Sequence, residues 1–257
     1  MARGTMLTDA GDTLLVRYAD PRRTTDDLAA LLTPAERERH RRSSPRAARH
    51  FLTATVLARR TLAERIGLAP EAVPITRTCA RCASDRADHG RPIVVGGPWV
   101  SWTHTDGLVA VAVHDRCPVG VDAEHLGRDI DLWTLAVRSL SPAEAQWWQT
   151  RPDDCRERAF LALWTFKEAV AKANGTGLTA PAGHIDVLGG KAAAVAGYTA
   201  MSLLSDSGHV VTAVVSGQVA GVDVAWFEDL HQRAVRRPAS RPQRLTNGIP
   251  TSRESRH

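Results

Sequence analysis

Apolar and polar residues alternate or cluster along this chain in a pattern that predicts both strands and helices. Residues 12–18 (DTLLVRY) predict a first strand. The sequence Thr-Pro-Ala-Glu at 33–36 predicts a helix that starts with a capping box. A Ser-Ser-Pro break at 43–45 separates this helix from a second one, which we expect to end at Gly67.

Two strands are predicted within residues 99–113, joined by the turn-forming dipeptide Asp106-Gly107. Residues 118–124 (PVGVDAE) predict another strand. Residues two apart in a strand face the same way, so Asp122 and Glu124 project together. Two carboxylates on one face repel each other unless a cation such as Mg²⁺ lies between them. The alternative is a strand that runs out into solvent at an acidic turn.

Residues 160–178 (FLALWTFKEAVAKANGTGL) predict an amphipathic helix with a glycine-rich stop. The helix holds two of the three lysines of the chain, Lys167 and Lys172. Trp164, Glu168 and Lys172 share one face at helical spacing. Two interpretations are open from these residues alone. One is a tryptophan beside a solvated Glu–Lys pair worth about 0.3 kcal/mol, and the other is a site where lysine approaches an oxygen as a point charge.

A weak internal repeat relates residues 107–122 to residues 208–223. Each copy has a glycine, a valine-rich strand, a turn and then Gly-Val-Asp. The repeat predicts two related α+β halves, each with its own hairpin. The second copy has Ala225 where the first has Glu124, so only the first could hold a metal in this way. The predicted division is an N-terminal half at 1–117, a C-terminal half at 118–230 and a disordered basic tail at 231–257.

Composition narrows the class of protein. The chain has 257 residues, 43% of them hydrophobic and 24% charged, with a net charge of +5. The positive charge favours an anionic partner. No apolar run approaches the roughly 20 residues that span a membrane, and the N-terminus lacks a secretory signal. We therefore expect a cytoplasmic protein with no membrane partner. Four cysteines in a chain of this length do not make a disulfide framework.

Two local patterns suggest sites. Cys79-x-x-Cys82 followed by His89 is half of a zinc site by spacing, and the alternative is a loop with free thiols. His104 ends a strand between two threonines, a setting that suits an anion. Arginines also gather at 37–49, where the alternative is a solvated face or a nucleic-acid patch.

Separated motifs together resemble those of the Sfp-type 4′-phosphopantetheinyl transferases. The family carries G-[IV]-D-x-E and later W-x-x-K-E-[AS]-x-x-K, preceded by a histidine at a strand end. Both motifs are complete here, at 120–124 and 164–172, and His104 precedes them. Gly-Arg-Pro at 90–92 also resembles the family. The family usually has Ser-His-Ser where this chain has Thr-His-Thr followed by Asp106. The resemblance runs from about residue 33 to residue 223.

The resemblance implies an α+β fold, a single chain of two pseudo-twofold-related α/β halves. It implies a holo-carrier-protein synthase that transfers the 4′-phosphopantetheine group of coenzyme A to a serine of an apo acyl or peptidyl carrier protein and releases 3′,5′-ADP. The reaction would need Mg²⁺, for which Mn²⁺ could substitute. A monomer serving polyketide or nonribosomal peptide biosynthesis is expected, while the specific carrier is left open.

The resemblance also implies roles for individual residues. Glu168 would bind the metal and take the serine proton, directly or through water. Lys172 would meet the phosphate and assist the leaving group. The arginines at 37–49 would bind the 3′-phosphate, and the alignment there can shift by one residue between Arg49 and His50. The catalytic residues implied are His104, Asp122, Glu168 and Lys172; the metal ligands are Asp122, Glu124 and Glu168; the coenzyme A ligands are Arg41, Arg42, Arg49, Arg91, Pro92, Thr103, His104 and Lys172.

A competing class is a nucleic-acid-binding module, suggested by the basic charge, the arginine run, the cysteine loop and the arginine-rich tail. It leaves Asp122, Glu124 and Glu168 unexplained, so we expect no nucleic-acid partner. A degenerate relative that only binds carrier proteins is a third reading, which the intact acidic residues and Lys172 oppose.

Overall fold

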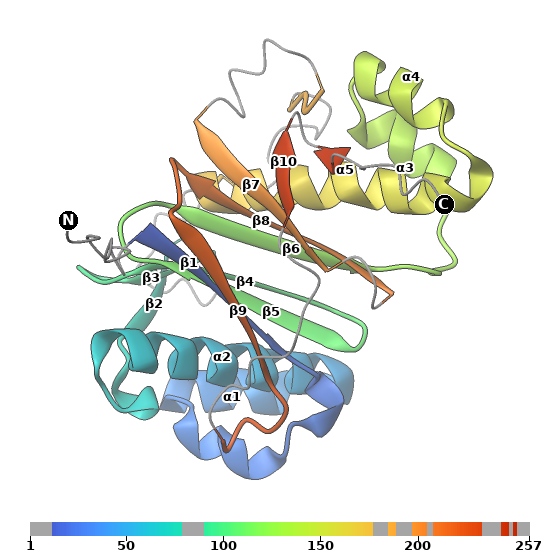
Figure 1. The fold of residues 1–257 in the computed structure, drawn as a ribbon. Helices are drawn as coiled ribbons and strands as arrows, with labels where there is room; N and C mark the ends of the chain where they lie inside the picture. Colours follow the sequence, from blue (N-terminus) through green and yellow to red (C-terminus); the bar gives the residue numbers. More distant parts are fainter. Residues whose placement is uncertain are drawn as a thin grey trace, which may run out of the picture.

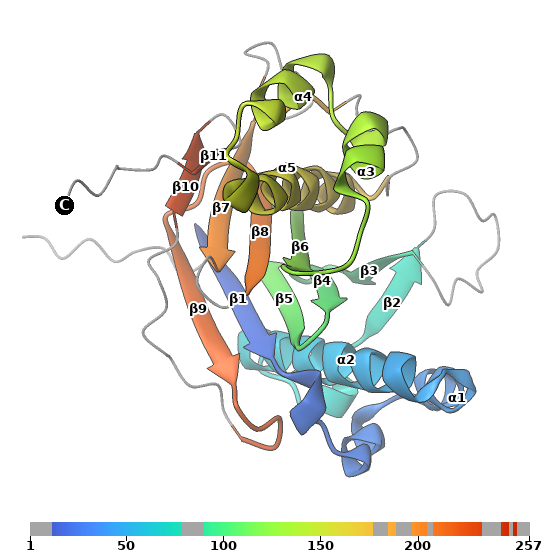
Figure 2. The same ribbon diagram turned by 90° about the vertical axis from the view of Figure 1, so that its right-hand side faces the viewer.

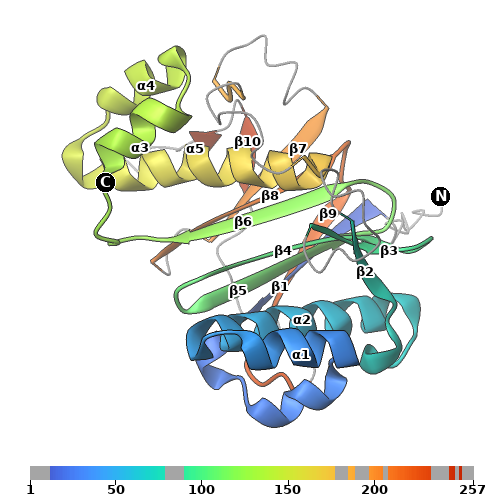
Figure 3. The same cartoon turned by 180° about the vertical axis from the view of Figure 1, so that it is seen from behind.

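The structure is a computed structural model that describes residues 12–78, 90–176, 185–188, 197–204, 208–232, 243–246 and 249–250. Four layers are stacked: helices around α2 (Pro45–Ile66), two β-sheets face to face, and helices around α5 (Asp153–Asn174) (Figure 1). Views from the side and from behind show the same order of layers (Figures 2 and 3). Within the described residues, every helix is too short or too polar to cross a membrane.

The first sheet contains the predicted first strand and the predicted hairpin. The strand β1 runs antiparallel to β5 and parallel to β9. The hairpin turns at Asp106-Gly107, where Gly107 adopts a φ of 71° that favours glycine. Across the sheet the order is β4 (Trp99–Thr105), β5 (Leu108–His114), β1 (Thr13–Ala19) and β9 (Gly221–Phe227).

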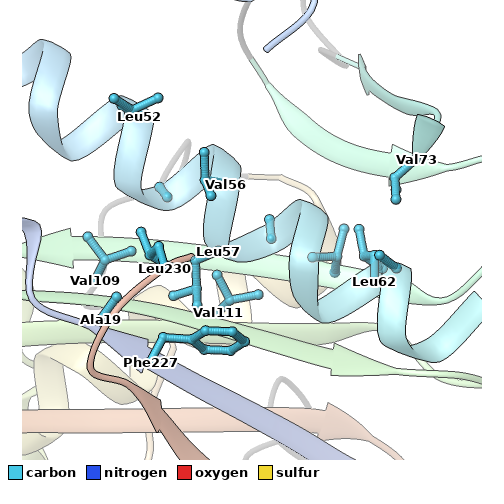
Figure 4. Close-up of a cluster of buried hydrophobic side chains, with 14 of the residues drawn as sticks. Ala19, Leu52, Val56, Leu57, Leu62, Val73, Val109, Val111, Phe227 and Leu230 are labelled. Atoms are coloured by element: carbon cyan, nitrogen blue, oxygen red, sulfur yellow. The ribbon is translucent and has the colours of Figure 1, made fainter. Parts of the chain in front are cut away.

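Helices α1 (Pro34–Arg42) and α2 lie on the outer side of this sheet (Figure 3). The predicted capping box forms at Thr33 and Glu36, and the break at 43–45 separates the helices as expected. α2 ends at Gly67 in a left-handed conformation. Its apolar face packs on the sheet in a core drawn in Figure 4, which includes Leu52, Val56, Leu57, Leu62, Val109, Val111 and Phe227.

Short elements connect the helices to the hairpin. A two-stranded sheet lies before β4, and three short 3-10 helices flank α1 and α2. Their bounds are η2 (Pro21–Arg23), η3 (Asp26–Leu31), η4 (Pro70–Ala72), β2 (Ile75–Thr78) and β3 (Arg91–Val94).

The second sheet carries α5 on its outer face, and α3 and α4 lie beside that helix (Figure 1). α5 begins at Asp153, earlier than the predicted start at residue 160, because its first turns are polar and give no apolar periodicity. The strand order is β11 (Ile249–Pro250), β10 (Gln243–Thr246), β7 (Tyr198–Leu204), β8 (His209–Ser216) and β6 (Val119–His125), and the helices are α3 (Leu132–Ser139), α4 (Pro142–Gln149) and α5.

The two sheets bury an apolar core between them. The predicted alternation in β6 is confirmed, because Val121 and Ala123 enter this core while Asp122 faces away from it. From the first sheet, Leu14, Val16 and Tyr18 of β1 meet them.

The order of elements confirms the predicted pair of related halves. The succession β1, α2, β4, β5 recurs as β6, α5, β7, β8, and each half gives the same strand order, β4-β5-β1 and β7-β8-β6. The repeated Gly-Val-Asp falls in β6 and in β9, and β9 joins the first sheet beside β1. The chain divisions at 117 and 230 stay a prediction.

Some predictions fall on residues that the structure does not describe. The zinc hypothesis rests on Cys79, Cys82 and His89, all outside the described residues. Within the predicted basic tail, the structure describes β10, which pairs with β7, and β11.

Candidate active site

A close crossing of β6 and α5 builds the centre of the site. A Cβ placed on Gly120 would lie 1.8 Å from the carbonyl oxygen of Ala169 and 2.8 Å from the backbone nitrogen of Ala173. Only glycine allows the helix backbone to come this near to the strand. Because Glu168 and Lys172 each precede one of these alanines, the same crossing brings both side chains to β6.

Asp122 is the buried acid of the site, with 6% of its surface exposed. Its Oδ1 atom accepts hydrogen bonds from Lys172 Nζ at 2.7 Å and from Thr103 Oγ1 at 3.0 Å. Lys172 Nζ also donates to the carbonyl oxygen of Val121 at 2.9 Å. The other carboxylate oxygen, Oδ2, is buried without a hydrogen-bond partner among the described residues. Such an oxygen is costly unless a cation or donor meets it.

Glu124 and Glu168 both interact electrostatically with Asp122. Burial raises the pKa of Glu168 to about 7, and the charges of Asp122 and Glu124 add to that rise while Lys172 opposes it. Burial and then Asp122 also raise the pKa of Glu124. Arg128 offsets this second shift through an ion pair with Glu124 at 2.8 Å.

The carboxylates are not gathered about one point as they stand. Throughout the part of the chain that the structure describes, no group of three or more His, Cys, Asp or Glu side chains is placed to hold a metal ion. The buried Oδ2 of Asp122 fits a hard cation in its present position. Glu124 would first have to leave its ion pair with Arg128 in order to bind that cation.

Two histidine rings in contact lie at the edge of the site. The rings of His50 on α2 and His104 on β4 have centroids 4.9 Å apart and planes inclined by 30°. Surrounding protein atoms lower the pKa of both rings. Arg46 and Arg49 lower the pKa of His50 further, and His50 and Lys172 lower that of His104. The sequence interpretation did not assign His50 a role, and its one signal was the alignment shift beside Arg49.

The other predicted arginines of this region differ in their surroundings. Arg41 and Arg42 form ion pairs with Glu38 of their own helix and are mostly exposed. Arg46 instead reaches across to Asp106 in the β4–β5 turn, at 3.3 Å. Of these arginines, Arg46 and Arg49 are the two whose charges act on the histidine pair.

Arg91 and Pro92 lie in β3, near the C-terminal end of α5. The Arg91 guanidinium stacks over the Trp99 ring at 4.5 Å, and its Nη1 lies 3.2 Å from the position of a Cβ on Gly175. Burial lowers the pKa of Arg91, and its Nε and Nη2 atoms are buried without hydrogen-bond partners among the described residues. Pro92 pairs with Arg77 across the small sheet.

The two lysines of α5 have different surroundings. Lys167 is fully buried and donates to Glu144 and, at 2.7 Å, to the carbonyl oxygen of Ser139. Glu144 caps α4 and also accepts from the backbone N–H of Val187 at 2.8 Å. Lys167 thus ties α5 to its neighbouring helices, whereas Lys172 enters the site.

A small cavity of about 140 Å³ adjoins Glu124. Phe160, Leu161 and Trp164 of α5 line it together with Leu135 of α3. On the same short helix Trp133 is 57% exposed and Val137 is 70% exposed. An apolar surface of this kind beside acidic side chains suits a macromolecular partner.

Comparisons with known proteins agree with the motifs. The model of the 4′-phosphopantetheinyl transferase superfamily matches residues 118–206. The 4′-phosphopantetheinyl transferase HetI of Nostoc sp. is 29% identical over 180 residues, which cover 68% of this chain and 72% of HetI. Two shorter matches are the 4′-phosphopantetheinyl transferases gsp of Aneurinibacillus migulanus and psf-1 of Bacillus pumilus. They are 31% and 36% identical over 37% and 35% of this chain, and over 38% and 39% of their own lengths.

Proposed function

The chain belongs to the 4′-phosphopantetheinyl transferase superfamily, and from this premise we propose that it uses Mg²⁺ and coenzyme A to modify a serine of an apo acyl or peptidyl carrier protein. The carriers proposed are those of polyketide or nonribosomal peptide biosynthesis. The observation that carries the site assignment is Asp122, buried with one free oxygen beside Glu168 and Lys172.

Asp122, Glu124 and Glu168 would hold the cation, because carboxylate oxygens are the ligands that Mg²⁺ prefers. When bound, Mg²⁺ would neutralise charge on the pyrophosphate of coenzyme A. Lys172 pairs with Asp122 in the structure, and its side chain is 28% exposed. Its ammonium group would meet a phosphate oxygen of the bound coenzyme A.

Glu168 is suited to act as the general base. A carboxyl group with a pKa of about 7 is poised to exchange a proton near neutral pH. In the transfer, the carrier serine oxygen would bond to the β-phosphorus as the bond to 3′,5′-ADP breaks. The serine proton would pass to Glu168, directly or through one water molecule. Positioning and charge neutralisation account for most of the catalysis of phosphoryl transfer.

The phosphates of coenzyme A would lie against the histidine pair. Arg46 and His50 of α2 and His104 of β4 present nitrogen donors there, and Arg46 carries the positive charge. Asp106 pairs with Arg46 at this surface. Burial and then nearby cationic groups lower the pKa of both rings, and an anion bound there would oppose these shifts.

The carrier would approach over α3. Trp133 and Val137 offer exposed apolar area, and the cavity beside Glu124 lies next to them. A serine presented at that face would come close to Glu124 and, through it, to Glu168.

The test is transfer followed by intact mass. The purified protein is incubated with coenzyme A, Mg²⁺ and a panel of apo carriers, beside the variants Glu168→Ala and Asp154→Ala. Asp154 is an exposed acid on the same helix and serves as the matched control. We expect wild type and the control to add one phosphopantetheine and Glu168→Ala to add none. A folded protein that binds no coenzyme A would contradict the proposal and favour nucleic-acid binding. Modification of fatty-acid carriers alone would contradict the proposed pathway.

A further inference from the structure

The edge strand β6 is held to the first sheet by side-chain hydroxyl groups. β6 is the last strand of its sheet, so one side of its backbone has no strand partner. The backbone N–H of Val121 donates to Ser101 Oγ at 3.2 Å, and its carbonyl oxygen accepts from Lys172. Two residues along β4 from Ser101, Thr103 makes the next such contact, to Asp122. These contacts between β4 and β6 join the two halves, and one of them is made by Asp122, the proposed metal ligand.

The Thr103 hydroxyl has one proton, and that proton is donated to Asp122 Oδ1, because an ionised carboxylate can only accept. A phosphate oxygen is also an acceptor. Thr103 could therefore donate to coenzyme A only by breaking its hydrogen bond to Asp122. Both side chains are buried, at 6% exposure each, so the pair is also shielded from competing water.

Two donors, Thr103 and Lys172, converge on the same oxygen of Asp122. The terminal torsion of an aspartate is broad and is easily turned unless its oxygens are held. Fixing Oδ1 from two elements leaves Oδ2 as the one oxygen that a cation can take. If Lys172 moves to a phosphate during transfer, Thr103 is the donor that keeps Oδ1 in place.

We propose that Thr103 is a positioning residue, which orients the Asp122 carboxylate for the cation, and not a ligand of coenzyme A. This inference rests on the proposed function of the site. It differs from the role that the family resemblance implies for Thr103, and the two roles have separable consequences for kcat and for the KM of coenzyme A.

The experiment compares Thr103→Val, Thr103→Ser and Thr105→Val. Valine keeps the shape of threonine and removes the donor, and serine restores it. Thr105 is a buried threonine on the same face of β4 whose hydroxyl is not bonded to Asp122, so it is the matched control. Mn²⁺ affinity is measured by electron paramagnetic resonance without substrate, and kcat and KM are measured by carrier mass.

We expect Thr103→Val to weaken Mn²⁺ binding and to lower kcat by about tenfold each, the usual effect of losing a residue that orients a metal ligand. The KM of coenzyme A should change by less than about twofold. Losing a hydrogen bond to a charged phosphate would raise the KM by more than that. Thr103→Ser and Thr105→Val should resemble wild type. A raised KM with unchanged Mn²⁺ affinity would assign Thr103 to coenzyme A and overturn the inference, as would an unchanged Thr103→Val protein. Should wild type bind Mn²⁺ but modify no carrier, the proposed function fails while the Mn²⁺ comparison still tests the positioning role.

Discussion

Gly120 in β6 lies directly beneath Ala169 in α5, so closely that any side chain on Gly120 would overlap the carbonyl oxygen of Ala169. The glycine of the Gly-Val-Asp sequence is therefore a packing requirement. It sets the height of α5 above the strand, and with it the reach of Glu168 and Lys172 toward Asp122.

Substituting Gly120 with alanine should lift α5 from β6. Backbone atoms cannot rotate away as a side chain would, so we expect a loss of about 3 kcal/mol in the free energy of unfolding, at the upper end for overpacking. Transfer activity should also fall in the protein that still folds. Urea unfolding and the carrier mass assay measure the two effects.

The internal repeat supplies the control for this variant. Gly221 holds the equivalent place in the Gly-Val-Asp of β9, and no atom lies within 4 Å of a Cβ built on it. Gly221→Ala should leave stability and transfer nearly unchanged. Equal effects at both glycines would show that the close crossing is not the cause.

Glu168 should make the fold less stable as pH rises. Its pKa is about 7 in the folded protein against 4.5 for an unperturbed glutamate, so between these values the folded state binds more protons than the unfolded state. The neutral Glu168→Gln variant removes this cost. With metal chelated, we expect it to be more stable than wild type above pH 7 by about 1 kcal/mol, after allowing for solvent screening, and little different near pH 4.

Denaturation midpoints across this pH range measure the difference. Glu64→Gln, an exposed position on α2, is the matched control for replacing a glutamate with glutamine. A Glu168→Gln protein that is less stable than wild type at pH 8 would contradict the assignment of burial as the main cause of the shift.

Substitutions of the two lysines of α5 should have different effects, one mainly on stability and the other mainly on transfer activity. Lys167→Met leaves the buried Glu144 carboxylate without its cation, a change that costs about 3–5 kcal/mol. Lys172→Met removes a partly exposed partner of Asp122, so we expect a smaller loss of stability and a loss of transfer of about 100-fold or more. Urea unfolding and transfer rates distinguish the two.

A second change tests the reason for the Lys167 effect. Adding Glu144→Gln to Lys167→Met removes the stranded charge and should recover part of the lost stability. No recovery would indicate that packing, and not the unpaired carboxylate, dominates.

Asp106 should weaken coenzyme A binding. Its carboxylate forms an exposed ion pair with Arg46 beside the two histidines. Exposed ion pairs are worth up to about 1 kcal/mol. Asp106→Asn frees Arg46, so the KM of coenzyme A should fall by about twofold to fivefold at low salt. The gain should shrink as salt rises. A higher KM would mean that Asp106 itself supports binding.

Much of the fold was predictable because its signals are local. The capping box at Thr33, the break at Ser43 to Pro45, the stop at Gly67 and the turn at Gly107 each depend on the chemistry of neighbouring residues. The start of α5 was not predictable from apolar periodicity, because the first turns of that helix carry Asp and Arg residues.

The candidate site was predictable only in part. The alternation in β6 placed Asp122 away from the apolar core, and the motifs selected Glu168 and Lys172. Helical spacing sets Lys172 on the face of Trp164 and Glu168, but no local signal shows what either Lys167 or Lys172 contacts. Their surroundings come from Glu144 and from Asp122, which are distant in the chain.

The sequence by itself determined the main strands and helices that carry the motifs, the repeat of two halves and the resemblance to the family, because spacing and residue type carry that information along the chain. Tertiary structure alone decided which residues meet. It brought the His50 ring into contact with the His104 ring, paired Arg46 with Asp106 and placed Thr103 within hydrogen-bonding distance of Asp122. The first two contacts join α2 to the β4–β5 hairpin, and the third joins β4 to β6 across the two halves. These segments are far apart in the chain, so no local periodicity predicts their contacts.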